Sequence, residues 1–474
     1  MVQRAIGFDV ARAIMRGIPI AVTLRNFGQL WKTSPLDLDR HSQTELWSKS
    51  QPVESFDVFF SHTWQTPGSK KFLSLLFQFG WRTAMANCVC CTTLVFLLAA
   101  SGALPMTSLT WPVNVVGFEM SCPFAPWIYL TGTLSLQIFL FLFPYCTRAS
   151  SSPKCFLDVV SIHQTDKTMK QRGVYGLGGF LSVSKEMRVL WSPPYLTRLW
   201  CVFELAAFRK ANPSKPLNLK PLFVESQVFL LILASGLCAG IYIAVRTGQG
   251  IVAVANLAMT PLLLFVHFNR KLMREEKMLK ASLETFDLKD VECHLAADRA
   301  FVSLAITAWY GSEESEEAFT EYIRGPLRDE LLAGSELELP MKSLVPPFDV
   351  FKLVGYGLFI AASPFCMLID VVVAMIRAGA PVDAVLAEFI GLGLGVTFFW
   401  NMLCVKIMWT LCSRWACHSS SWVWDCLVSL VIFLVFLLLL AVSNIIVTSL
   451  LTISTTGAMA AGIGLSVSAH PGLF

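Results

Sequence analysis

The segment "RLWCVFELAAF" at residues 198–208 places one acidic side chain in an otherwise mostly apolar stretch. Its apolar residues recur with helical spacing, so Trp200 and Glu204, four residues apart, are expected on one face of a helix. An indole beside a carboxyl group excludes water and raises the pKa of that group, which suits it to general acid/base chemistry or to stabilising a cation. We therefore take Glu204 as the candidate catalytic residue. The alternative is that this helix start only packs against its neighbours.

The elements around this helix alternate between strands and helices. Buried strands are expected at residues 57–60, in "CFLDVVSIHQTD", in "MRVLWS" and in "LNLKPLFVES", with helices between them. This alternation predicts a parallel sheet with helices on both faces. Asp158 is expected inside the second strand, as a buried and hydrogen-bonded carboxylate.

Ligands of such sheets bind beyond the carboxyl ends of the strands. Several polar and aromatic residues are expected there or on the helix that follows the third strand. Backbone partners would explain the two histidines equally well, and Tyr195 would either stack on an adenine or cap its strand. The candidate substrate-binding residues are His62, Trp64, His163, Gln164, Ser192, Tyr195 and Trp200.

The composition is that of a membrane protein. Of 474 residues, 55% are hydrophobic and 15% are charged, whereas a soluble domain carries about 25% charged residues. The net charge of +4 argues against nucleic acid as a partner, and the cluster of Cys88, Cys90 and Cys91 lacks the spacing of a metal site. Seven apolar runs are long enough to cross a bilayer: 82–104, 126–146, 227–245, 251–268, 350–376, 382–411 and 423–451.

The distribution of positive charge predicts how these spans are oriented. The loop between the first two spans contains no Lys or Arg, whereas the segments on their other sides contain "GSKKF" and "KTMKQRG". Because positively charged loops stay in the cytosol, the N-terminus and the regions 147–226 and 269–349 are expected there. Residues 1–32, with interleaved arginines, are expected to form an amphipathic helix on the membrane surface, although a mitochondrial presequence looks similar.

Two acids and a glycine-rich run lie inside the apolar segments. Asp370 and Glu388 are expected near the outer ends of their spans, where a carboxylate reaches interfacial water; a transport site is the alternative. The run "GLGLG" at 391–395 is expected to allow close packing of helices rather than to bind a nucleotide.

The soluble segments resemble the Toll/interleukin receptor (TIR) homology domain. "FDVFFSH" looks like the opening strand of that family, and "SVSKEMRVLWSPPYLTRLWCVFELAAF" looks like its Ser-x-x-Tyr and Trp-Cys-x-x-Glu-Leu pattern. "LNLKPLFVE" looks like the next strand. The resemblance covers residues 54–81 and 154–225. The sequence departs from the family at His62-Thr63-Trp64 and in the membrane hairpin that separates the two halves.

The resemblance implies a flavodoxin-like domain that assembles with copies of itself in signalling. In some members the Glu of this pattern drives cleavage of the nicotinamide–ribose bond of NAD⁺, and that Glu matches Glu204. Positive charge builds on the ribose as this bond breaks, and a carboxylate stabilises it as in glycoside hydrolysis. NAD⁺ would then be a substrate, and no cofactor is required.

These expectations divide the chain into seven parts and leave three functions open. The first function is a membrane-anchored TIR-like signalling protein that hydrolyses NAD⁺, the second is a non-catalytic scaffold, and the third is a channel or transporter with a regulatory domain. The expected parts are the N-terminal segment 1–49, TIR-like halves at 50–81 and 147–226, transmembrane hairpins at 82–146 and 227–268, a cytosolic helical region at 269–349 and a transmembrane bundle at 350–474.

Overall fold

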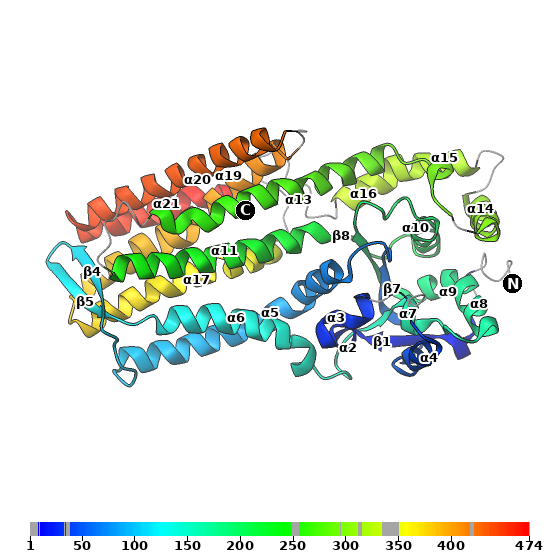
Figure 1. Ribbon diagram of the computed structural model, residues 1–474, viewed down its shortest axis with the longest axis horizontal. Coiled ribbons are helices and arrows are strands. Elements are labelled where there is room, and N and C mark those ends of the chain that lie inside the picture. Colours follow the sequence, from blue (N-terminus) through cyan, green and yellow to red (C-terminus); the bar gives the residue numbers. More distant parts are fainter. Residues whose placement is uncertain are drawn as a thin grey trace. The chain divides into compact units, whose positions relative to one another are not determined.

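The computed structural model describes residues 8, 10–32, 34, 38–248, 256–293, 295–310, 315–333, 350–417 and 421–473. The chain forms two compact units (Figure 1). Unit one comprises Met1–Gln78, Leu142–Glu225 and Glu275–Glu338, and unit two comprises Phe79–Phe141, Ser226–Arg274 and Leu339–Phe474. The chain therefore passes from unit one into unit two three times.

Unit one contains a mixed sheet of six strands in the order β2-β1-β6-β3-β7-β8. The neighbours β6, β3, β7 and β8 pair in parallel, while β1 runs antiparallel to both β6 and β2. The predicted set of four parallel strands is confirmed, and β1 and β2, which join by antiparallel pairing, extend it at one edge. The strands are β1 (Arg16–Pro19), β2 (Gln51–Pro52), β3 (Phe56–Ser61), β6 (Lys154–Phe156), β7 (Ser184–Trp191) and β8 (Leu217–Pro221).

The first and second parallel strands meet although a long insertion separates them in the sequence. Val58 of β3 lies opposite Cys155 of β6, across the hairpin that the chain makes in between. Aromatic side chains hold the pair together, since the rings of Phe59 and Phe156 stack with centroids 4.5 Å apart and Phe180 packs beside them. Strand β3 is buried along most of its length, which explains its continuous apolar run.

The second and fourth parallel strands are shorter than predicted. Strand β6 ends at Phe156, and Asp158 begins the short helix α7 (Asp158–Ser161) instead of lying inside the strand. Asp158 lies in the first turn of α7, where a negative side chain interacts favourably with the helix N-terminus. Strand β8 similarly ends at Pro221, and helix α11 (Leu222–Thr247) begins at the next residue.

The amphipathic N-terminal helix is not found among the described residues. Residues 16–19 form β1 instead, where Ile18 is fully buried between neighbouring elements. Pro19 lacks a backbone N–H and favours an extended conformation, so this segment gains more from joining the sheet than from a surface helix.

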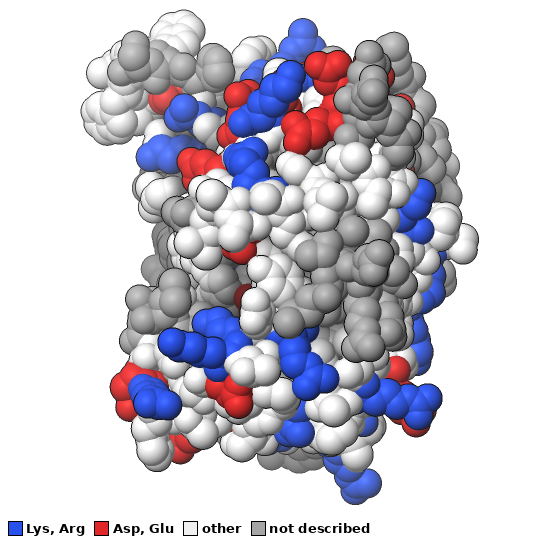
Figure 2. All heavy atoms as spheres, turned by 90° about the vertical axis from the view of Figure 1, so that its right-hand side faces the viewer, with Lys and Arg blue, Asp and Glu red and all other residues white. Residues whose placement is uncertain are grey.

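Helices surround the sheet of unit one. The face shown in Figure 2 carries Lys and Arg side chains interspersed with Asp and Glu side chains. Helix α5 (Gly68–Ala100) starts in this unit, and the predicted helix after the first strand and the first predicted span are one continuous helix. The other helices are η1 (Arg12–Ile14), α2 (Ile20–Thr23), α3 (Arg25–Lys32), α4 (Arg40–Ser48), α7, α8 (Lys167–Tyr175), α9 (Leu177–Ser182), α10 (Leu199–Ala211), η4 (Leu288–Asp290), α14 (Ala296–Tyr310), α15 (Ser315–Tyr322), η5 (Ile323–Leu327) and α16 (Arg328–Ala333).

Six helices among the described residues are long and apolar enough to cross a membrane, which is compatible with a multi-pass membrane protein. The third of them ends at Thr247. The fifth combines three helical segments, of which the middle one is π-helical. The first four are α5, α6 (Trp127–Cys146), α11 (Leu222–Thr247) and residues Tyr356–Arg377 of α17 (Val350–Arg377). The fifth, Val382–Arg414, consists of α18 (Val382–Glu388), η6 (Phe389–Trp400) and α19 (Asn401–Arg414). The sixth is α20 (Trp422–Leu451).

The predicted span at 251–268 has no counterpart among these six helices. Residues 251–255 lie outside the described part of the chain, and η3 (Asn256–Met259) leads into α13 (Thr260–Glu284). Only the first turns of α13 are apolar, and Asn269 and Arg270 begin a segment rich in Arg, Lys and Glu. Helix α21 (Thr455–Leu473) follows α20 and contains a shorter apolar stretch.

The loop predicted between the first two spans is a β-hairpin. Strands β4 (Leu109–Val115) and β5 (Phe118–Phe124) pair in antiparallel register from Leu109 opposite Phe124 to Val115 opposite Phe118. Val116 and Gly117 form the turn, where Gly117 has a φ of 78° that suits glycine. The hairpin packs against α17, at one end of the helices of unit two in Figure 1.

Asp370 and the glycine run in the apolar helices have structural partners. Asp370 is buried rather than open to water, and its carboxylate accepts the backbone N–H groups of Ile128 at 2.9 Å and Tyr129 at 2.7 Å, at the start of α6. Glu388 is also buried. A Cβ on Gly395 would lie 2.4 Å from Gly462 of α21, so the glycine run brings two helices into close contact, as predicted.

Candidate functional site

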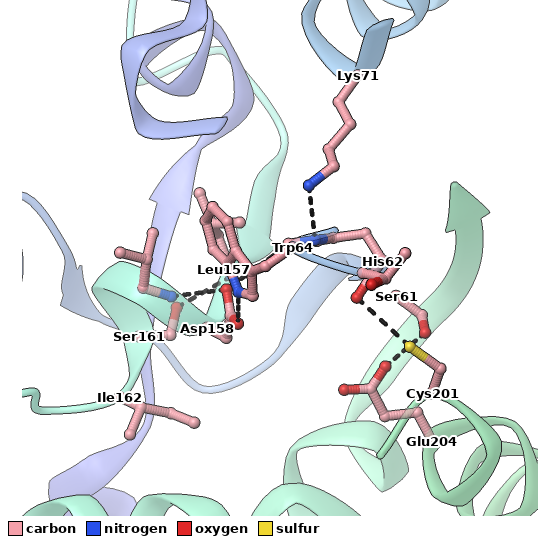
Figure 3. Close-up of polar contacts among 12 residues, drawn as sticks. Ser61, His62, Trp64, Lys71, Leu157, Asp158, Ser161, Ile162, Cys201 and Glu204 are labelled. Atoms are coloured by element: carbon pink, nitrogen blue, oxygen red, sulfur yellow. Dashed lines mark hydrogen bonds and ion pairs between the residues drawn. The ribbon is translucent and has the colours of Figure 1, made fainter. Parts of the chain in front are cut away.

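Glu204 lies on α10, the helix that follows the third parallel strand, and faces the carboxyl end of β3. Its carboxyl group accepts a hydrogen bond from the hydroxyl of Ser61, the last residue of β3 (Figure 3). The hydroxyl of Tyr195 lies 2.5 Å from the same Ser61 oxygen. Since the single Ser61 proton is directed to Glu204, the hydroxyl of Tyr195 donates to Ser61. The candidate catalytic residue is thus held at the strand end by two hydroxyl groups in series.

The surroundings of Glu204 favour its protonated form. Burial raises the pKa of Glu204 to about 8, the hydrogen bond from Ser61 opposes this change, and the negative charge of Asp158 adds to it. The predicted direction of the pKa shift is therefore confirmed. Burial rather than an adjacent indole is its main cause.

A second set of polar side chains lies at the same strand end. Asp158, directly after β6, accepts the indole N–H of Trp64 at 2.7 Å, and its other oxygen lies 3.6 Å from Nε2 of His62. The ammonium group of Lys71, on the first turn of α5, lies 3.2 Å from Nδ1 of the same imidazole. A lysine ammonium has no lone pair to accept with, so Lys71 donates to Nδ1 and the proton of a neutral His62 is on Nε2, towards Asp158. Lys71, His62 and Asp158 therefore form a chain of alternating charge around a neutral ring (Figure 3).

The directions of the pKa shifts of His62 and Asp158 agree with this arrangement of charges. Burial lowers the pKa of His62, the charge of Lys71 lowers it further, and the contact with Asp158 acts in the opposite direction. For Asp158, burial alone would raise the pKa, but the hydrogen bonds from His62, Trp64 and Val159 outweigh it and the pKa is lowered. Asp158 is therefore an ionised carboxylate at neutral pH, close to the protonated Glu204.

Cys201 lies between the two sets of side chains. Its thiol contacts the backbone carbonyl of His62 at 3.5 Å from α10, one turn before Glu204. Burial and the nearby Glu204 raise the pKa of Cys201 well above the usual value for a thiol. Cys201 is thus a protonated packing residue of the site rather than a thiolate nucleophile.

Four of the eight predicted site residues come together around Glu204 and Asp158, and the other four have hydrogen-bond partners of their own. Trp200 turns away from Ser61 and donates its indole N–H to Asp298 of α14 at 3.1 Å. Ser192 exchanges a hydrogen bond with Thr66. His163 accepts the N–H of Asp166 at 3.0 Å, and the Gln164 amide donates to backbone carbonyls in and after α7, the shortest contact being 2.8 Å to Ile162. The predicted residues brought together are His62, Trp64, Tyr195 and Glu204.

Three residues of the site were not among the candidates chosen from the sequence. Ser61 ends β3 and Lys71 belongs to "GSKKF", which was used only to orient the membrane spans. Asp158 was expected inside a strand as a structural carboxylate; it is hydrogen-bonded as expected, but it lies at the strand end. The rule that ligands bind at carboxyl ends of strands would have selected Ser61, whereas only the folded chain brings Lys71 to His62.

The site lies where the strand order reverses. The chain goes from β3 to β6 on one side and then returns to β7 on the other side of β3, and ligands of doubly wound sheets bind at such a point. Ser61 ends β3, and Ser192 directly follows β7. Within the described part of the chain, no three His, Cys, Asp or Glu side chains are grouped as metal ligands.

Comparison of the chain with models of protein families, with curated proteins and with solved structures found no match.

Proposed function

We propose that this chain is a membrane-anchored, TIR-like signalling protein that hydrolyses NAD⁺ at the nicotinamide–ribose bond. The observation that carries the proposal is the position of Glu204. It is a half-buried carboxyl group with a raised pKa, at the carboxyl edge of a parallel sheet and at the point where the strand order reverses. We place unit one in the cytosol, because the loops that bound it are rich in Lys and Arg.

The strand order supports a flavodoxin-like domain. Numbered along the chain, the four parallel strands β3, β6, β7 and β8 run in the order second, first, third, fourth. The flavodoxin-like order begins in the same way, and its ligand binds between the first and third strands. Ser61, Tyr195 and Glu204 lie at the corresponding place here.

The proposed reaction needs one negative charge and one water molecule. The bond between ribose C1′ and the nicotinamide nitrogen breaks, and its electron pair leaves with neutral nicotinamide. Positive charge then develops on the ribose, and the ionised carboxylate of Glu204 stabilises it. Water adds to C1′ and releases a proton, so the products are ADP-ribose, nicotinamide and H⁺. Tyr195 and Ser61 hold the carboxyl group in place for this step.

The test follows NAD⁺ loss catalysed by the full-length protein in lipid discs. We expect Glu204→Gln and Glu204→Ala to lower the rate by roughly 100-fold or more, since they remove a group that acts in the transition state. Glu186→Gln is the matched control, because Glu186 lies on β7 and pairs with Arg188 away from the site. It should retain the wild-type rate.

Equal background rates in the folded wild-type protein and both Glu204 variants would rule out the enzymatic proposal. That result would favour the non-catalytic scaffold. The next measurement would then be self-association of the reconstituted protein. Ion or solute flux in reconstituted vesicles would favour a channel or transporter instead.

A further inference from the structure

Asp158 is a held and partly open carboxylate beside Glu204. Its side chain is 38% exposed, in contrast to His62, which is 3% exposed. One carboxylate oxygen accepts the indole N–H of Trp64 at 2.7 Å, and the other accepts the backbone N–H of Val159 at 2.7 Å. The two oxygens of a carboxylate offer about four acceptor positions. The exposed part of Asp158 therefore has acceptor capacity left for a bound molecule.

The contacts behind Asp158 fix its orientation. His62 lies 3.6 Å from the carboxylate, and Lys71 holds the far side of the imidazole at 3.2 Å. Lys71 is itself fully buried, and its ammonium lies 4.8 Å from the ring centre of Trp64. This layer keeps Asp158 ionised and pre-oriented, which reduces the cost of ordering it around a ligand.

Adjacent residues of the chain connect Asp158 to Glu204. Ser61 donates to Glu204, and the next residue, His62, contacts Asp158. The two carboxyl groups therefore lie at the carboxyl ends of the first and second parallel strands, beside the same strand β3. Both side chains lie at this edge of the sheet (Figure 3).

The position of Asp158 suggests which part of a ligand it contacts. In dinucleotide-binding sheets of the doubly wound type, an acidic residue near the end of the second strand accepts hydrogen bonds from ribose hydroxyls. Asp158 follows the second parallel strand here, and an ionised carboxylate is an acceptor that matches hydroxyl donors. The likeness to those sheets is one of fold alone, and the exposure and hydrogen bonds of Asp158 support the same role independently.

We propose that Asp158 accepts hydrogen bonds from ribose hydroxyl groups of a nucleotide bound at this edge, with Trp64 and His62 as positioning residues. The inference rests on the proposed function for its choice of NAD⁺ as the nucleotide. The inference concerns binding of the nucleotide and not its cleavage, so binding can be measured without turnover.

The experiment compares the binding of NAD⁺ with that of analogues lacking the 2′- or 3′-hydroxyl of either ribose. Full-length Glu204→Gln protein in lipid discs is titrated by calorimetry, so that no ligand is cleaved. A lost hydrogen bond to a charged acceptor weakens binding by roughly 10- to 100-fold, and we expect this for at least one analogue. Asp158→Asn on the same background should remove most of the difference, and Trp64→Phe should reduce it.

Asp57→Asn is the matched control, because Asp57 lies near the other end of β3 and pairs with Lys185 at 2.7 Å. It should retain the preference for the intact ribose. Equal binding of NAD⁺ and every analogue would overturn the inference, as would a preference unchanged by Asp158→Asn or no binding of NAD⁺. The analogue comparison needs no change at Asp158, so it decides the question even if Asp158→Asn does not fold.

The two proposals fail in different ways. Cleavage of NAD⁺ by the wild-type protein without any ribose preference would leave the proposed function and overturn the role of Asp158. A ribose preference without cleavage would leave the role of Asp158 and overturn the proposed hydrolysis.

Discussion

Glu204 and Asp158 lie at one edge of the sheet, yet their surroundings shift their pKa values in opposite directions. Burial dominates at Glu204, whereas hydrogen bonds from His62, Trp64 and Val159 outweigh burial at Asp158. Pairs of carboxyl groups with separated pKa values are typical of sites that divide acid and base roles. At neutral pH this edge therefore offers one protonated and one ionised carboxyl group.

The proposed role of Glu204 predicts a pH dependence of NAD⁺ cleavage. Only the ionised form stabilises the ribosyl cation, and burial raises the pKa of Glu204 to about 8. The rate should therefore rise about tenfold per pH unit below that pKa and become level above it. Asp158, with its lowered pKa, stays ionised over this range and adds no further step. The measurement is the initial rate of NAD⁺ loss between about pH 5.5 and 9.5.

Two controls make this pH dependence specific to Glu204. The residual rate of Glu204→Gln should not follow the same curve, because the amide does not titrate. Glu186→Gln should reproduce the wild-type curve. A wild-type rate that falls with rising pH would contradict the role of the ionised carboxylate.

At the scale of elements, α5 connects the site to the apolar helices. The helix follows β3, and its first turn supplies Lys71 to His62. The same helix continues without interruption into a stretch that is apolar enough to cross a bilayer. One element thus carries both a positioning side chain of the site and a candidate membrane span.

The contact between η6 and α21 predicts a specific sensitivity to side-chain size. A Cβ on Gly395 would lie 2.4 Å from the Cα of Gly462, which is backbone and cannot rotate away. We expect Gly395→Ala to destabilise the protein by about 1–3 kcal/mol through overpacking. The measurement is the midpoint of thermal unfolding in detergent, followed by circular dichroism.

Gly464 on the same helix α21 provides the matched control. A Cβ there would meet no described atom within 4 Å, so Gly464→Ala should leave the midpoint unchanged or raise it slightly, as alanine favours helices. Equal midpoints for the two variants would show that the close contact does not limit stability.

At the scale of the whole molecule, the six apolar helices and the distribution of Lys and Arg predict an orientation. The β4–β5 hairpin contains no Lys or Arg in its strands or its turn. It is therefore expected on the side of the membrane opposite the cytosol. Unit one is expected in the cytosol. Orientation decides which unit meets cytosolic NAD⁺, so it bears directly on the proposed function.

A single substitution tests this orientation. Val116→Thr completes an Asn-x-Thr acceptor at Asn114, an exposed residue of the hairpin, and we expect glycosylation there during synthesis with microsomes. Pro213→Ala completes an acceptor at Asn212 in unit one, which should stay unmodified. The readout is a shift in gel mobility that an endoglycosidase reverses. Glycosylation at Asn212 instead would reverse the predicted orientation.

Local patterns in the sequence determined much of the architecture. The apolar run at 57–60 and the runs within β7 and β8 predicted buried parallel strands, because strand burial leaves a local signal. The apolar stretches predicted all six helices of membrane-spanning length for the same reason. Helical spacing placed Glu204 on α10, and the rule for strand ends placed His62, Trp64 and Tyr195 at the correct edge.

Only the tertiary structure decided what surrounds those residues. Ser61 meets Glu204 across 143 positions of sequence because β3 pairs with β7, the strand before α10. Trp64 meets Asp158 across 94 positions because β3 also pairs with β6. Strand β1, which lies between β2 and β6, and the short helix at Asp158 also depend on their neighbours rather than on their own residue pattern. Local sequence therefore specifies which segments are buried and helical or extended, while the partners of each polar side chain follow from which strand ends the fold brings together.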